Sequence, residues 1–61
     1  MLLRDLLELL DYNEHISLWT TTGINIESGL ADSDNIRNYG SYEVYRVSGV
    51  GRKDLNITID M

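Results

Sequence analysis

Residues 55–61 read Leu55-Asn56-Ile57-Thr58-Ile59-Asp60-Met61. Apolar and polar side chains alternate through the whole segment, and this period of two is typical of a strand with one buried face. The side chains expected to face the core are Leu55, Ile57, Ile59 and Met61. Such a strand needs neighbouring strands and a cover for its apolar face, and the rest of the sequence offers both.

Three further segments have strand-like patterns, at residues 15–21, 24–27 and 42–47. Thr22 and Gly23 favour a turn between the first two, which predicts a hairpin. In the third, Val44 and Val47 are three residues apart, so either a bulge re-aims one of them or both faces are partly covered. The hairpin connections are too short for parallel crossovers, so we expect an antiparallel sheet of about four strands.

Residues 2–11 predict the helix that covers this sheet. Leucines recur at positions 2, 6 and 9 and at 3, 7 and 10, which is helical spacing, and leucine favours helices. A helix of about 15 Å does not persist alone in water, so we expect it to pack on one sheet face. The expected core comprises Leu6, Leu10, Ile16, Leu18, Ile57 and Ile59.

The polar segment 31–40 predicts a short helical turn in the middle connection. Asp32 or Ser33 is the expected N-cap, and Gly40 is the expected left-handed closing residue. The sequence has no proline and only scattered glycine, so it shows no linker or repeat. It therefore predicts a single small α+β domain over residues 1–61.

The composition narrows the classes of function. The 61 residues include no cysteine, which excludes disulfides and metal sites with thiolate ligands. The single histidine, His15, excludes metal sites with two histidine ligands. Ten acidic and five basic residues give a net charge of −5, which argues against direct binding to nucleic acid or anionic membranes. Charged residues interrupt the leucine-rich start, and no segment resembles a signal peptide or membrane span. We expect a cytoplasmic protein.

Short motifs that resemble ligand sites fail in their details. Asp32, Asp34 and Glu43 occupy the first, third and twelfth positions of a calcium loop, but Ile36 and Arg37 replace an oxygen ligand and the required glycine. We therefore interpret these acids as a helix cap and a strand residue.

Two other candidates also lack essential features. Residues 49–53 combine glycines with two cations but lack the P-loop frame, and a strand follows. His15 has no nucleophile motif beside it, so it more simply forms a polar cluster with Asp11 and Glu14. We expect no catalytic residue, no metal and no cofactor, and hence a protein that is not an enzyme.

Acidic residues recur every three positions at Asp5, Glu8, Asp11 and Glu14. On a helix they would sweep an arc, since successive members rotate by about 60°. This arc is either the solvated back of an amphipathic helix or a surface that imitates a nucleic-acid backbone.

Trp19 and Tyr45 are the candidate interface residues. Trp19 alternates against the core positions of its strand, so it should lie on the sheet face away from the helix, and Tyr45 joins it there if no bulge intervenes. Large aromatic residues on such a face favour an interface. The alternative is a ring that lies flat beside Arg46 or Thr58 on a monomer.

A domain this small has a thin core, so we expect self-association as a homodimer. The contact would lie either around Trp19 and Tyr45 or along the helix edge at Leu3 and Leu7.

Five stretches, at residues 3–10, 16–18, 28–32, 42–44 and 55–59, carry a resemblance that spans nearly the whole chain. Their order resembles that of small phage and prophage proteins of uncharacterised function, which begin with a short Leu-rich helix followed by strands. The resemblance implies a mobile-element origin in a bacterial cytoplasm and carries over no catalytic residue.

Two hypotheses follow. The first is a small accessory protein that acts by protein–protein contact and forms a homodimer. The second is an acidic inhibitor that imitates nucleic acid and blocks a host nucleic-acid or defence enzyme. Salt separates them, because charge mimicry weakens as salt rises and an aromatic contact barely responds.

Overall fold

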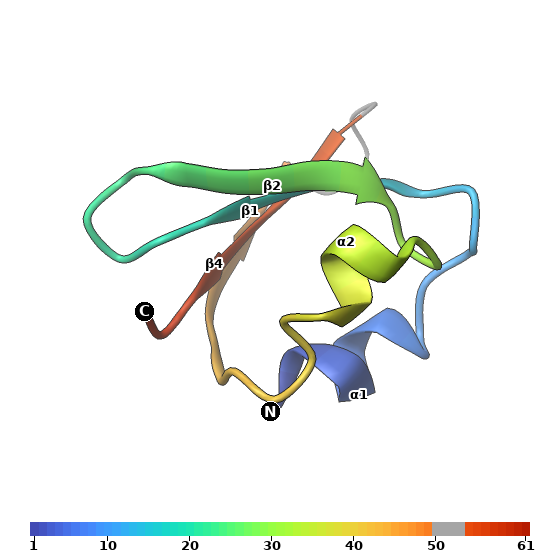
Figure 1. Cartoon of the computed structure of the whole chain (residues 1–61), viewed down its shortest axis with the longest axis horizontal. Coiled ribbons are helices and arrows are strands. Elements are labelled where there is room, and N and C mark those ends of the chain that lie inside the picture. The colour runs from blue at the N-terminus through green and yellow to red at the C-terminus, as the bar shows by residue number, and fades with distance from the viewer. Residues whose placement is uncertain (50–53) are drawn as a thin grey trace.

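The computed structural model describes residues 1–49 and 54–61. In chain order its elements are α1 (Leu3–Leu7), β1 (His15–Trp19), β2 (Asn25–Leu30), α2 (Asp34–Arg37), β3 (Val44–Ser48) and β4 (Asp54–Ile59). The strands form one sheet in the order β2-β1-β4-β3. Figure 1 shows the two short helices together on one side of this curved sheet. The chain is thus α+β, as the sequence predicts.

The sheet is mixed, and the prediction of a purely antiparallel sheet was wrong. β1 pairs antiparallel with β2, and β3 with β4, so both predicted hairpins are present. They meet at the centre of the sheet, where β1 and β4 run parallel with Ile16 opposite Leu55. A short hairpin turn fixes only the two strands that it joins as antiparallel, and it does not fix how the two hairpins pair with each other. The connection between β2 and β3 is long enough for a crossover, which needs about a dozen residues.

One face of the sheet supplies most of the core. The buried cluster consists of Leu3, Leu7, Ile16, Leu18, Ala31, Ile36, Leu55, Ile57 and Ile59. The alternation of β4 is therefore confirmed from Leu55 to Ile59, and the buried positions of β1 are as predicted. Met61 is exposed, because β4 ends at Ile59.

α1 is shorter than the predicted helix and ends at Leu7. The amides of residues 9 and 10 instead donate to carbonyls three residues back, in the tighter geometry of a 3₁₀ turn. Leu3 and Leu7 are buried, whereas Leu6 and Leu10 pack only at the margin of the core. Leu9 is 75% exposed. The buried leucine pair is therefore displaced from the predicted one.

Backbone pairing of residues 1–3 accounts for this displacement. Leu2 forms an antiparallel bridge with Glu43, just before β3. The Leu3 amide donates to the Tyr42 carbonyl at 2.9 Å, and the residue 44 amide donates to the residue 1 carbonyl at 2.8 Å. These bonds set where α1 begins and how it is rotated, so Leu3 and Leu7 are the residues that turn inward.

α2 is the helical turn predicted within residues 31–40. Ser33 occupies the N-cap position, but its hydroxyl donates to the Leu30 carbonyl at 2.7 Å and makes no capping bond to the helix. Ile36 is fully buried and joins α2 to the core. Gly40 does not have a positive φ, so its expected left-handed role is not observed.

A bulge resolves the spacing in β3. The register of β3 against β4 shifts between Val44 and Arg46, which leaves Tyr45 without a paired residue. Val44 and Val47 consequently both oppose isoleucines of β4, on the core side. Of the two alternatives, the bulge is the one found. In the part of the chain that the structure describes, no helix has the length and apolarity to cross a membrane.

Candidate functional site

The sheet face away from the helices is open and largely polar. In the parallel register of β1 and β4, Ser17 lies opposite Asn56 and Trp19 lies opposite Thr58. These four residues alternate with the core positions of their strands, and their side chains are half-buried. Paired residues of adjacent strands share a face, so Trp19 stands among small polar groups at the centre of the sheet.

Asn56 holds the indole of Trp19 in place. The Trp19 Nε1–H donates to Asn56 Oδ1 at 3.0 Å, across the parallel pair of strands. A half-buried indole N–H needs such an acceptor, and the bond restricts the orientation of the ring. The open face thus presents an aromatic ring in a defined position.

Gly49 leaves room for this asparagine. Its φ is +80°, which favours glycine, and a Cβ there would lie 3.2 Å from Asn56 Nδ2. The same Cβ would lie 2.9 Å from the Asp54 carbonyl oxygen. A larger residue at position 49 would therefore displace the group that anchors Trp19.

Tyr45 lies on the same face as Trp19. The two rings, together with Arg46, Asn56 and Thr58, line a shallow hollow of about 450 Å³, which we call the outer depression. Tyr45 is 69% exposed. The structure therefore brings together the two aromatic residues that the sequence singles out, although Tyr45 reaches this face from a bulge.

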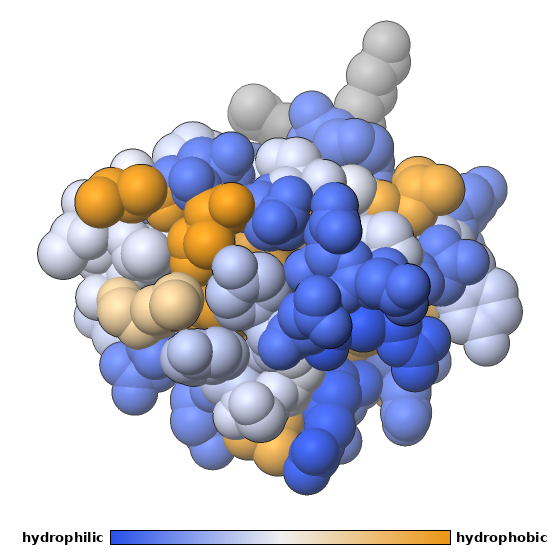
Figure 2. All heavy atoms as spheres, in the orientation of Figure 1, coloured by the Kyte–Doolittle hydropathy of each residue, from blue (hydrophilic) through white to orange (hydrophobic). Residues whose placement is uncertain are grey.

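Two exposed apolar residues that sequence reasoning missed lie near the outer depression. Ile24 follows Gly23, which also lines the depression. The Thr21 hydroxyl donates to the Met61 carbonyl at 3.1 Å, which holds Met61 beside the same hairpin end. Figure 2 shows hydrophobic atoms over this end of β1 and β2, whereas the surface over α2 is hydrophilic. Strict alternation placed Met61 in the core and gave no signal for Ile24.

The second predicted contact, along the helix edge, is corrected. Leu3 is fully buried and Leu7 nearly so, because both belong to the core cluster. Neither side chain has the exposed surface that a contact requires.

The acidic residues do not form one helical arc. α1 ends at Leu7, so Asp5 lies on the helix, Glu8 at its C-terminal cap, and Asp11 and Glu14 beyond it. Glu14 is half-buried just before β1, and the other three are exposed. Because α1 ends at Leu7, the three-residue spacing does not place the later acidic residues on a helix.

His15 pairs with Asp54 and not with its sequence neighbours. Its Nδ1 lies 2.8 Å from Asp54 Oδ1, and the two residues oppose each other in the parallel register. The sequence does not show which residue lies opposite His15, because that depends on the strand register.

Among residues 1–49 and 54–61, no group of three or more His, Asp or Glu side chains is placed to hold a metal ion. Most of the glycine- and cation-containing segment 49–53 lies outside the described residues.

Comparisons of the chain with protein-family models, with curated proteins and with solved structures found no match.

Proposed function

We propose that this protein is a non-enzymatic accessory protein that acts by protein–protein contact through the outer depression. The observation that carries the proposal is the tryptophan that lines this depression. Trp19 lies half-buried on an open face and is oriented by Asn56, and Tyr45 adds an exposed ring that lines the same depression. Tryptophan, tyrosine and arginine are the residues that most often dominate binding energy at interfaces, and Arg46 completes this set.

The charge of the outer depression supports the same proposal. None of the described residues that line it is acidic, although the chain contains ten acidic residues. Interface centres are depleted in charge and enriched in aromatic residues and arginine. The chain has a net charge of −5, but the outer depression is aromatic and free of acidic residues. A partner that covers it therefore buries no carboxylate of the described lining residues.

The partner that we propose first is a second copy of this chain. A two-fold contact lets the same surface cover itself, which is the commonest arrangement among small soluble oligomers. The sequence predicts two possible contacts, one around Trp19 and Tyr45 and one along the helix edge at Leu3 and Leu7. Because Leu3 and Leu7 lie in the core, the outer depression is the one that remains.

Sedimentation of the wild type and of single variants tests this proposal. The wild type should be a dimer at micromolar concentration, and Trp19→Ala should weaken the dimer by about 2 kcal/mol, or roughly thirtyfold. Tyr45→Ala should weaken it as well. Tyr12→Ala is the matched control, since Tyr12 is 72% exposed and lies outside the outer depression. A wild type that stays at 7.0 kDa, or equal effects of the two tyrosine variants, would contradict the proposal.

The proposal extends to the position of α1 and to the origin of the protein. Leu3 and Leu7 belong to the same buried cluster as the strand residues, which supports packing of α1 on the sheet.

The order of segments supports a mobile-element protein of the bacterial cytoplasm. A gene located among phage genes is the expected finding, and a gene within a metabolic operon would contradict this origin.

A further inference from the structure

The free edge of β2 is a surface separate from the outer depression, which no residue of this fully described strand lines. The two margins of the sheet are β2 and β3, and β2 lies beside α2 (Figure 1). An edge strand presents backbone N–H and C=O groups that can pair with another chain, and folded proteins commonly block such edges. The two edges of this sheet differ in how far they are blocked.

The edge of β3 is blocked along most of its length. Leu2 pairs with Glu43 just before the strand, so the start of this edge already has a backbone partner. The bulge at Tyr45 then interrupts the regular alternation of backbone groups, and the exposed Arg46 adds a charged side chain next to it. Little of β3 is therefore open to another strand.

The edge of β2 is regular over residues 27–30, which pair with β1 without a register shift. The Ala31 amide donates to the Glu14 carbonyl at 2.9 Å, so the backbone groups of Ala31 face β1. In an antiparallel pair this direction alternates along the strand. The N–H and C=O groups of Ser28 and Leu30 therefore point away from β1, out of the edge of the sheet.

Three of these four outward groups have no partner among the described residues. The Leu30 carbonyl accepts from the Ser33 amide at 2.9 Å and from the Ser33 hydroxyl at 2.7 Å, in agreement with its outward direction. The N–H and C=O of Ser28 and the N–H of Leu30 form no hydrogen bond with another described residue outside the β1 ladder. Ser28 is exposed. A second strand matches the spacing of these three groups.

The side chains beside this edge are apolar on one face and acidic on the other. Leu30 lies opposite His15 on the outer face and is 45% exposed. Glu27 lies opposite the buried Leu18, on the helical face, and is half-buried. Its Oε1 accepts from Asn35 Nδ2 at 3.4 Å, and within the described residues its carboxylate forms no ion pair. The edge thus carries a carboxylate that a cation could neutralise.

We propose that β2 binds an extended basic segment of a partner protein, which adds to the sheet as a further antiparallel strand. In this arrangement one partner residue bonds both free groups of Ser28. The partner residue opposite Leu30 lies on the outer face and is apolar. The residue three positions later lies opposite Glu27 and is lysine or arginine, because opposite charges on facing strands stabilise the pair.

Charge argues against a second copy of β2 as the occupant of this edge. Residues 24–36 contain three acidic residues and no basic one, so two such edges repel each other. A basic segment replaces this repulsion with attraction. The proposal does not depend on the homodimer, because the edge of β2 and the outer depression share no described residue.

Titration of the full chain with the blocked peptide TVTVRT tests the proposal by NMR. In the proposed register the first valine of the peptide lies opposite Leu30, and its arginine lies opposite Glu27. The amide signals of Ser28 and Leu30 should shift saturably, and their hydrogen exchange should slow as the peptide occupies the edge. The peptide TVTVET, with glutamate in place of arginine, should bind more weakly.

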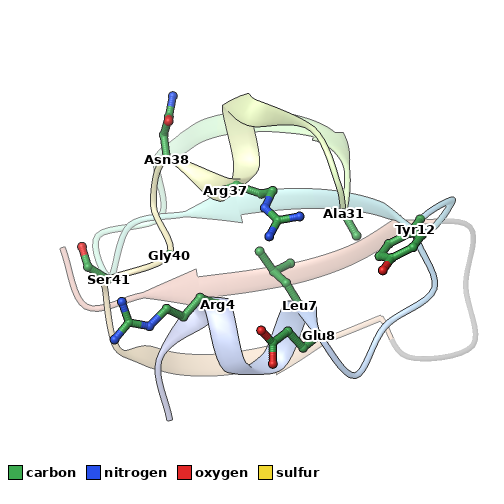
Figure 3. Close-up of a pocket in the computed structure, with 9 residues that line it drawn as sticks. All are labelled: Arg4, Leu7, Glu8, Tyr12, Ala31, Arg37, Asn38, Gly40 and Ser41. Atoms are coloured by element: carbon green, nitrogen blue, oxygen red, sulfur yellow. The ribbon is translucent and has the colours of Figure 1, made fainter.

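Two variants of β2 test the backbone and the charge separately. Ser28→Pro removes an N–H that points away from β1, so the protein should fold and bind TVTVRT about fivefold more weakly or less. Glu27→Gln should weaken binding about threefold, because it removes the cross-strand charge pair. Glu8→Gln is the matched control, since Glu8 lines a separate hollow between α1 and α2 (Figure 3), and it should leave the affinity unchanged. Thermal unfolding should show that each variant is folded.

Several results would overturn the proposal. Absence of saturable shifts at Ser28 and Leu30, or a folded Ser28→Pro variant that binds as tightly as the wild type, would remove this edge as the site. Equal affinities for TVTVRT and TVTVET, or equal effects of Glu27→Gln and Glu8→Gln, would refute the preference for a basic partner. Slow exchange of the two amides that increases with protein concentration, without peptide, would assign the edge to a second copy. Tyr45→Ala should leave peptide binding unchanged, which separates this result from that of the homodimer.

Discussion

Leu3 and Leu9 are chemically identical residues of one segment in opposite surroundings. Leu3 is fully buried, whereas Leu9 is 75% exposed. Leu3→Ala should lower the free energy of unfolding by about 2–5 kcal/mol, because it removes buried methyl groups and leaves a cavity. Leu9→Ala should change it by less than about 0.5 kcal/mol. Urea denaturation of both variants measures the difference, and similar losses would show that α1 does not lie against the core as described.

Gly23 allows a second comparison at single-residue resolution. Its φ is +88°, and a Cβ there would meet nothing within 4 Å, so only backbone conformation opposes substitution. Gly23→Ala should therefore cost about 1–2 kcal/mol, while Gly23→Asn should cost less, because asparagine tolerates this region better. Thermal unfolding of the two variants checks the order. Equal stability of the alanine variant and the wild type would mean that the turn adopts another conformation.

At the level of elements, local sequence patterns correctly predict the features that depend on a single short segment, such as strand alternation and turns. The alternation of β4 and the glycine turn at residue 23 depend on near neighbours, and both hairpins form as expected. The parallel pairing of β1 with β4 depends on a crossover between distant segments, and no local pattern reports it. The same holds for α1, whose rotation is set by bonds to Tyr42 and neighbouring residues.

The candidate sites show the same division. Alternation places Trp19 on the outer face, but its anchor Asn56 becomes visible only through the parallel register. The pairing of His15 with Asp54 has no sequence signature at all, because the two residues oppose each other only in the parallel register of β1 and β4. A site whose residues are distant in the sequence can be recognised only once the fold is known.

The strand order predicts which elements open last. β1 and β4 are central and bonded on both sides, whereas β2 and β3 are edge strands. Amide hydrogen exchange should therefore be slowest in β1 and β4, with opening free energies close to the global value, and faster in the edge strands. Slower exchange in β2 or β3 than in β4 would contradict the order β2-β1-β4-β3.

For the whole molecule, net charge decides how salt affects association. Two copies that each carry −5 repel one another, and salt screens this repulsion over a Debye length of about 10 Å at 0.1 M. The proposed contact is aromatic and acid-free, so it contains little attraction for salt to weaken. The homodimer should therefore become equally or slightly more stable as salt rises from 0.05 to about 0.5 M.

Mimicry of nucleic acid predicts the opposite response. An acidic surface that occupies a basic groove binds through opposite charges, so its affinity falls steeply with salt. Sedimentation of the homodimer and titration of a basic test protein over the same salt series distinguish the two behaviours. A salt-resistant dimer that Trp19→Ala weakens supports contact through the outer depression. A dimer that dissociates with rising salt would place the contact among charged residues and overturn that role for Trp19.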